Sequence, residues 1–102
     1  MDDSTNTIYE MIHHLHTLLR QNLPMLEKQV NQIITNKITD SNRINRLLDD
    51  LLDFAQISEG LEVFKRLCRY AYPIYPDLTA SHIHYYRELY DDTYTPPDSD
   101  DE

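Results

Sequence analysis

Residues 40–55 read DSNRINRLLDDLLDFA and carry the clearest structural pattern in the chain. Apolar residues recur there at intervals of three and four, as on one face of an α-helix, at Ile44, Leu47, Leu48, Leu51, Phe54 and Ala55. Asp40 and Ser41 come just before them, and both residue types are favoured at a helix N-cap. Arg46 lies one turn from both Asp49 and Asp50, so ion pairs are expected on the opposite, solvated face. We therefore predict an amphipathic helix that starts near Asp40.

The chain before this helix shows the same periodicity, but a proline interrupts it. Thr7 followed by Glu10 matches a capping box, which predicts that a helix begins there and runs over about residues 8–21. Pro24 should break or kink this helix because proline disturbs a helix interior. A further stripe follows at Met25, Leu26, Val30, Ile33 and Ile34. Two helices or one long kinked helix would both fit this pattern.

A third helical pattern follows residue 55 after a short linker. Ser58 and Gly60 mark the point where one helix should end and the next begin. The new apolar stripe consists of Leu61, Phe64, Leu67, Cys68 and Ala71. Because the linker is short, we expect this helix to pack antiparallel to the one before it.

The last helix is expected after a tyrosine- and proline-rich connector. Residues 72–76 should be extended, because the residue before a proline is disfavoured in the α-helical region. Asp77 or Thr79 can then cap a helix that ends near Tyr90. Its predicted apolar face comprises Leu78, His82, Tyr85, Tyr86 and Leu89, with Ile83 and Tyr90 beside it.

Composition favours the same all-α fold class. A single glycine in 102 residues suits helices better than β-rich folds, which need glycine at tight turns. We predict a small antiparallel bundle of four to five helices over residues 7–90, after a flexible N-terminus at residues 1–6. Residues 91–102 are acidic and rich in Thr, Ser and Pro, and are expected to be a disordered acidic tail.

Charge is distributed unevenly along the chain, whose formal net charge is −9. Of the 18 acidic residues, two lie at positions 2 and 3 and six in residues 91–102, which leaves 10 acids against nine Lys and Arg in residues 4–90. Direct nucleic-acid binding is therefore not expected, because it needs a larger basic surface. A lone cysteine, an N-terminus without a signal-peptide pattern and the lack of a long apolar run predict a cytoplasmic protein without a membrane segment.

Histidines and the cysteine are the only candidates for an enzyme site. His13 and His16 share a helix face and could bind a metal with His82 or His84, and His14 lies between them. The spacing matches no standard zinc motif, so buried or surface histidines are the expected alternative, and no metal or other cofactor is predicted. Cys68 could be a nucleophile, but its place on an apolar stripe favours a core role.

Tyrosines are unusually concentrated near the C-terminal end of the predicted bundle. Six of the eight lie within about twenty residues: Tyr70, Tyr72, Tyr75, Tyr85, Tyr86 and Tyr90. Tyrosine is enriched at protein interfaces because it combines an apolar ring with a hydrogen-bonding hydroxyl. The same residues could instead pack the connector against the bundle, so they are candidate partner-binding residues with a structural alternative.

These features favour a non-enzymatic role in binding. We expect an adaptor, inhibitor or regulatory subunit that recognises another protein, or a second copy of itself, through a tyrosine-rich helical face. An acidic mimic of nucleic acid, or inhibitor of a basic partner, is the second hypothesis, with Asp49, Asp50 and Asp53 as the acids on a predicted helix. An enzyme that uses the histidines or Cys68 is the third.

Overall fold

The computed structural model describes residues 3–91, and the predicted tail at 91–102 lies outside the described residues except for Asp91. Four helices account for nearly all of the described chain and no strand occurs among these residues, which confirms the all-α prediction. They are α1 (Asp3–Thr35), α2 (Ser41–Phe54), α3 (Ser58–Ala71) and α4 (Pro76–Tyr90). The fold is a small helical bundle.

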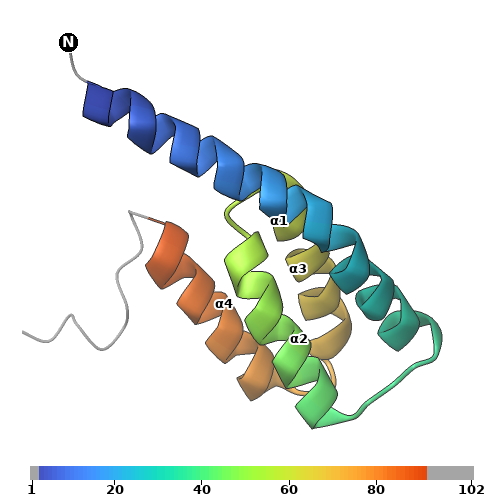
Figure 1. Cartoon of the computed structure of the whole chain (residues 1–102). Helices are drawn as coiled ribbons and strands as arrows, with labels where there is room; N and C mark the ends of the chain where they lie inside the picture. The colour runs from blue at the N-terminus through green and yellow to red at the C-terminus, as the bar shows by residue number, and fades with distance from the viewer. Residues whose placement is uncertain (1–2, 92–102) are drawn as a thin grey trace, which may run out of the picture.

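The helices form a bundle in which α2 and α3 are central (Figure 1). The second half of α1 packs on one side of the α2–α3 pair, and α4 packs on α2 and α3 from the other side. Within the described residues, α1 and α4 do not pack against each other. The first half of α1 extends past the ends of the other helices (Figure 1).

Helix α1 is one continuous helix with Pro24 inside it, which resolves the alternative left open by the sequence. It begins at Asp3, so the predicted start near residue 8 is wrong, and Thr7 and Glu10 lie within the helix. The segment from Asp3 to Asn6 consists of residue types that are themselves favoured at helix N-termini, which allows the helix to begin earlier.

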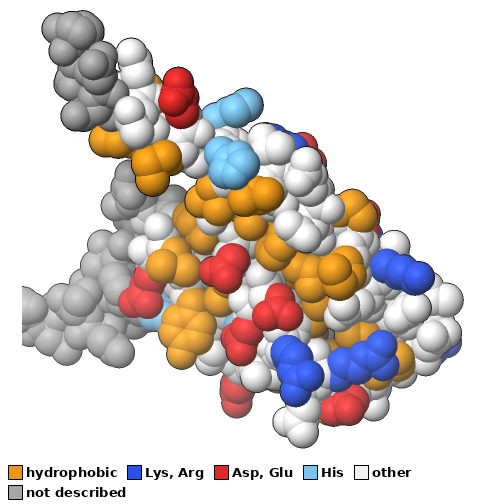
Figure 2. Space-filling model, viewed as in Figure 1, with side chains coloured by type: hydrophobic (Ala, Val, Ile, Leu, Met, Phe, Trp, Pro, Cys, Tyr) orange, Lys and Arg blue, Asp and Glu red, His pale blue; other side chains and the backbone are white. Residues whose placement is uncertain are grey.

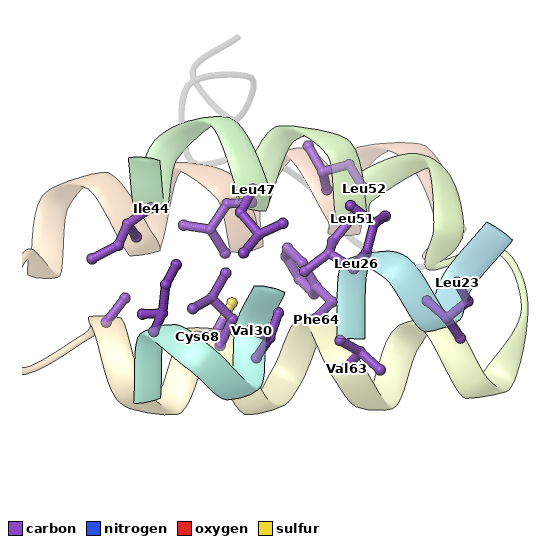
Figure 3. Close-up of a cluster of buried hydrophobic side chains, with 14 residues drawn as sticks. Leu23, Leu26, Val30, Ile44, Leu47, Leu51, Leu52, Val63, Phe64 and Cys68 are labelled. Atoms are coloured by element: carbon purple, nitrogen blue, oxygen red, sulfur yellow. The ribbon is translucent and has the colours of Figure 1, made fainter. Parts of the chain in front are cut away.

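The core lies where α1, α2 and α3 meet (Figure 3). Its fully buried side chains include Val30 and Ile33 of α1, Ile44 and Leu48 of α2, and Leu67 of α3. Tyr86 and other residues of α4 pack against this cluster from outside and are only partly buried. The interior therefore draws on the predicted stripes of the three first helices.

The N-cap predicted for α2 is confirmed. The side chain of Asp40 accepts hydrogen bonds from the backbone N–H groups of Asn42 and Arg43, at 3.0 and 3.4 Å. The predicted pairing of Arg46 with Asp49 or Asp50 does not occur, and Asp49 contacts His82 of α4 at 2.6 Å.

The connector before α4 is a tight turn, so the predicted extended conformation is wrong at Tyr72, whereas Tyr75, which precedes Pro76, does lie outside the α-helical region, with φ −133° and ψ 74°. Tyr72 is helical, with φ −57° and ψ −46°, although it precedes a proline. Its N–H donates to the Cys68 carbonyl at 2.9 Å, and the N–H groups of Ile74 and Tyr75 both donate to the Ala71 carbonyl. These backbone hydrogen bonds stabilise the turn and outweigh the local preference of the residue before proline.

Helix α4 begins before both predicted caps, Asp77 and Thr79. Pro76 occupies the first helical position, where its missing N–H costs nothing, and Tyr75 is the N-cap. Thr79 lies within the helix and its side chain is buried, with its hydroxyl donating to the Tyr75 carbonyl at 2.8 Å. The predicted end near Tyr90 is confirmed.

Candidate protein-binding surface

Five of the six candidate tyrosines make contacts within the chain, including Tyr85, whose ring centroid lies 6.1 Å from that of His82. The hydroxyl groups of Tyr70 and Tyr75 donate to the carbonyl groups of Ile38 and Thr39, which lie between α1 and α2. At the other end of the bundle, the Tyr90 hydroxyl donates to the Leu52 carbonyl at 2.9 Å. These bonds connect the C-terminal third of the chain to the linker before α2 and to the end of α2.

The aromatic ring of Tyr86 also packs inside the chain. Its centroid lies 5.9 Å from that of Phe64 and 5.3 Å from that of Tyr90, distances at which aromatic rings attract one another. Tyr72 and Tyr85 are the two candidates that remain about half exposed. The six tyrosines therefore do not form one exposed face.

The buried face of α4 differs from the predicted one. Thr79 and His82 are its buried residues, while Tyr85 and Leu89, which were predicted to face the core, are exposed. The helix packs on α2 and α3 alone, so only a narrow face is covered. The surface of α4 therefore contributes scattered apolar side chains to solvent.

The structure separates the histidines into different environments. His13 and His14 are exposed on α1, whereas His82 and His84 lie on α4, which does not pack on α1. His82 is buried, with Nδ1 2.9 Å from the Leu78 carbonyl oxygen and Nε2 2.6 Å from Asp49 Oδ1. Within residues 3–91, no cluster of three or more His, Cys, Asp or Glu residues could hold a metal ion.

Cys68 is buried in the core, with 7% of its surface exposed. Desolvation by burial raises the pKa of its thiol to about 12, and the nearby positive charge of Arg69 offsets only part of that effect. The thiolate is the nucleophilic form of cysteine, and this environment disfavours it. The contacts of Cys68 are those of a core residue.

The small basic patch on α3 is partly neutralised. Arg66 donates to the Asn31 side chain and forms an ion pair with Glu27 at 3.3 Å, and Lys65 lies 3.9 Å from Glu62. Such a patch offers few free cations to a phosphate backbone.

Most of the exposed large hydrophobic residues of the described chain lie in the first part of α1, here called the α1 arm and defined as residues 3–22. Figure 1 shows it extending beyond the bundle, and Figure 2 shows hydrophobic side chains gathered along its underside. These large residues are 42–65% exposed: Ile8, Met11, Ile12, Leu15 and Leu18. Leu19 is half-buried and completes the stripe. They all lie on one helix face, because they recur at three- and four-residue intervals.

That exposed face continues directly into the core. Leu23, Leu26 and Val30 follow on the same side of α1 and are buried against α2 and α3. The change from exposed to buried occurs where those two helices begin to cover α1. An arm residue such as Leu15 therefore has the side chain and orientation of a core residue but no covering partner within the described chain.

Helix lengths explain why the arm is uncovered. The 33 residues of α1 span about 50 Å, whereas the 14 residues of α2 or α3 span about 21 Å. Helices of that length can cover less than half of α1. The long apolar stripe on both sides of Pro24 was visible in the sequence, but it did not show whether this segment forms one helix or two. Two short helices could each have been covered by the rest of the bundle, whereas one long helix could not.

The base of the arm is attached to the bundle by a charged contact. Arg20 Nε lies 3.1 Å from Glu59 Oε2 at the start of α3. A backbone hydrogen bond to Glu59, together with the Arg20 side chain, lowers the pKa of the Glu59 carboxyl. Both side chains are about half exposed, so this ion pair orients the arm more than it stabilises the fold.

Among the described helices, none is both long and apolar enough to span a membrane. Comparison with known protein families, with curated proteins and with solved structures gives no match. Function is therefore inferred from the chain's own geometry.

Proposed function

We propose that this chain is a protein-binding module that acts through the apolar face of the α1 arm. The observation that carries the proposal is the continuous stripe from Ile8 to Leu19, which is held in a helical conformation and left in contact with solvent. Exposed apolar patches of this kind mark interaction sites in soluble domains. A helix that presents side chains at intervals of three and four residues is also a recurrent form of protein recognition.

The residues around the stripe favour a protein over a charged surface as the partner. From Asn6 to Leu19 the arm contains no Lys or Arg, and Glu10 is its only acidic residue. Helices that lie on membranes usually carry many basic residues on their polar face, and nucleic-acid sites carry them as well. An uncharged partner groove lined with apolar side chains would complement this arm best.

Two finer expectations from the sequence stay predictions. Tyr72 and Tyr85 are exposed and could extend a binding surface, although they lie away from the α1 stripe in the chain. The second expectation is a cytoplasmic location. It rests on the single cysteine, which cannot form a disulfide within the chain.

The proposal is tested by partner capture from a lysate of the native host. Ile12→Glu places a charge in the exposed stripe without touching the core, and Met25→Glu makes the same change at an exposed position of α1 beside the buried stripe. A partner retained by the wild type and by Met25→Glu but lost with Ile12→Glu supports the arm. A partner lost only with Tyr85→Ala, or only when residues 92–102 are deleted, would place binding elsewhere and contradict the proposal.

A further inference from the structure

We propose that the apolar face of the α1 arm binds the same face of a second copy of this chain, with the two arms antiparallel about a two-fold axis near Leu15. This inference rests on the proposed function of the arm and names its partner. Three observations carry it: the place where the face becomes covered, the symmetry of the stripe, and its lack of charge.

The bundle permits only one direction for such a pair. From Leu23 onward, the same face of α1 is occupied by α2 and α3. In a parallel pair, the two bundles would lie at the same end and compete for the same space. In an antiparallel pair about Leu15, Leu23 of each copy lies opposite Thr7 of the other, so the covered part of α1 begins just outside the stripe and the exposed faces can meet from Ile8 to Leu19.

Within four residues of Leu15, the stripe has the same pattern in either direction, whereas seven residues away Ile8 on one side corresponds to Asn22 on the other. Ile12 and Leu18 lie three residues on either side of it, and Met11 and Leu19 lie four residues on either side. In a two-fold symmetric contact, a residue that meets a given position of the partner is met by it in return. An antiparallel second copy would therefore place apolar side chains opposite apolar side chains, with Leu15 facing its own counterpart.

Charge does not oppose this pairing, despite the net charge of −9. An α-helix turns by 100° per residue, which places His14 at one edge of the stripe and His16 at the other. Nearer the N-terminus, Thr7 lies at the same edge as His14, and Tyr9 at the same edge as His16. Neither the stripe nor these flanking positions include Lys, Arg, Asp or Glu. The stripe and its flanks therefore bring no like charges together between the two arms.

The contact area is that of a weak dimer. Each copy offers the exposed parts of six large side chains, roughly several hundred Å², so that a pair approaches the ~1,000 Å² expected of a small specific interface. Dissociation constants in the micromolar range are therefore expected, and the dimer should appear only as the concentration rises.

Sedimentation of the full chain at increasing concentration tests the pairing. We expect the wild type and Met25→Glu to change from monomer to dimer, and Leu15→Glu, which would place two carboxylates at the axis, to stay monomeric at least tenfold higher in concentration. Circular dichroism should show that all three are folded, since Leu15 lies outside the core. A wild type that is monomeric up to about 1 mM, or a dimer unaffected by Leu15→Glu, would overturn the inference.

Cross-linking tests the direction of the helices independently. In a Cys68→Ala background, Leu15→Cys should form a disulfide-linked dimer, and a chain with Ile12→Cys should link to one with Leu18→Cys faster than to itself. Faster self-linking of Ile12→Cys would indicate parallel arms and contradict the proposal.

The outcomes separate this inference from the proposed function. If the chain is monomeric but a different protein is captured in an Ile12-dependent manner, the arm binds a partner and only the second copy is wrong. If neither a dimer nor an Ile12-dependent partner is observed, both proposals fail.

Discussion

The imidazole of His82 is buried between α4 and α2, where its Nε2 lies 2.6 Å from Oδ1 of Asp49. Its other ring nitrogen, Nδ1, lies 2.9 Å from the Leu78 carbonyl oxygen within α4. A carbonyl oxygen can only accept a hydrogen bond, so Nδ1 is the donor to Leu78, and Nε2 is paired with the Asp49 carboxyl group. Both polar atoms of a buried ring are thereby satisfied, and one of them depends on a side chain from another helix.

Removing the Asp49 carboxylate should therefore weaken the attachment of α4. We expect Asp49→Ala to lower the free energy of unfolding by about 1–3 kcal/mol, the usual cost of leaving a buried polar group unpaired. Asp49→Asn, which keeps an oxygen acceptor, should cost less. Urea denaturation measures both, with the exposed neighbour Asp50→Ala as the control, which should change stability by about 0.5 kcal/mol or less. Equal effects of Asp49→Ala and Asp50→Ala would show that the contact is unimportant.

Gly60→Ala should destabilise the protein, contrary to the usual effect of this substitution in a helix. Alanine is normally preferred to glycine there by about 1 kcal/mol. At Gly60, however, an added Cβ would lie 1.9 Å from the carbonyl oxygen of Phe54, a backbone atom that cannot move away easily. We expect a net loss of about 2 kcal/mol or more in thermal or urea unfolding. Glu62→Ala on the exposed side of α3 is the matched control, and stabilisation by Gly60→Ala would disprove the close contact.

Cys68 should react with thiol reagents only after the protein opens. Burial raises its pKa from 9.0 to about 12, which reduces the thiolate fraction at pH 8 by about a thousandfold. Burial also blocks access, so labelling by a disulfide reagent should be at least that much slower in buffer than in denaturant. Comparable rates in the two conditions would mean that Cys68 is accessible, and the enzyme hypothesis would regain support.

Leucine-to-alanine substitutions should have very different effects on the free energy of unfolding in the two halves of α1. Leu26→Ala removes a core side chain and should cost about 2–5 kcal/mol in free energy of unfolding. Leu15→Ala should change that free energy by less than about 0.5 kcal/mol at low protein concentration, because Leu15 is exposed and does not belong to the core cluster. A large loss with Leu15→Ala in dilute monomer would show that the arm is packed within its own chain.

The free energy of unfolding at alkaline pH should depend on the protonation of Tyr90. Desolvation, then the charge of Asp53 and the nearby Tyr86, raise its pKa above the ordinary 10.0. Above pH 10, the unfolded chain loses this proton before the folded chain does, so the free energy of unfolding falls as pH rises towards the raised pKa. Below pH 10 the contribution is fully present.

Tyr90→Phe should make the alkaline loss of stability smaller, and Tyr72→Phe, at an exposed tyrosine, should leave it unchanged. Urea unfolding at a series of pH values from 8 upward measures this difference. The Cys68 thiol contributes to the same trend in every variant and cancels in the comparison. An identical pH dependence in wild type and Tyr90→Phe would contradict the assigned environment.

The periodicity of apolar residues was sufficient to predict α2 and the core parts of α1 and α3, since burial of one face is what produces that pattern. It was not sufficient for the ends of helices. The turn at Tyr72 depends on hydrogen bonds to Ala71 and Cys68, which outweigh a local conformational preference and are invisible in the sequence. The start of α1 was misplaced because several adjacent residue types suit an N-terminus equally well.

The candidate site was only partly predictable for a related reason. A pattern such as Ile8–Leu19 shows which face of a helix is apolar, but not whether another helix is present to cover it. The tyrosines presented the same ambiguity, and their hydroxyl contacts with Ile38, Thr39 and Leu52 come from segments that are 32 to 38 residues away. Both questions depend on tertiary arrangement.

The continuity of α1 through Pro24 has one further consequence, which concerns helical phase. Because the arm and the buried stripe belong to a single helix, each residue added or removed between Leu19 and Leu23 would rotate the arm by about 100° around its axis while leaving the interior unchanged. Insertions at this position thus offer a way to redirect the arm without unfolding the protein. The length of one short stretch of helix sets the direction in which the molecule presents its apolar side chains.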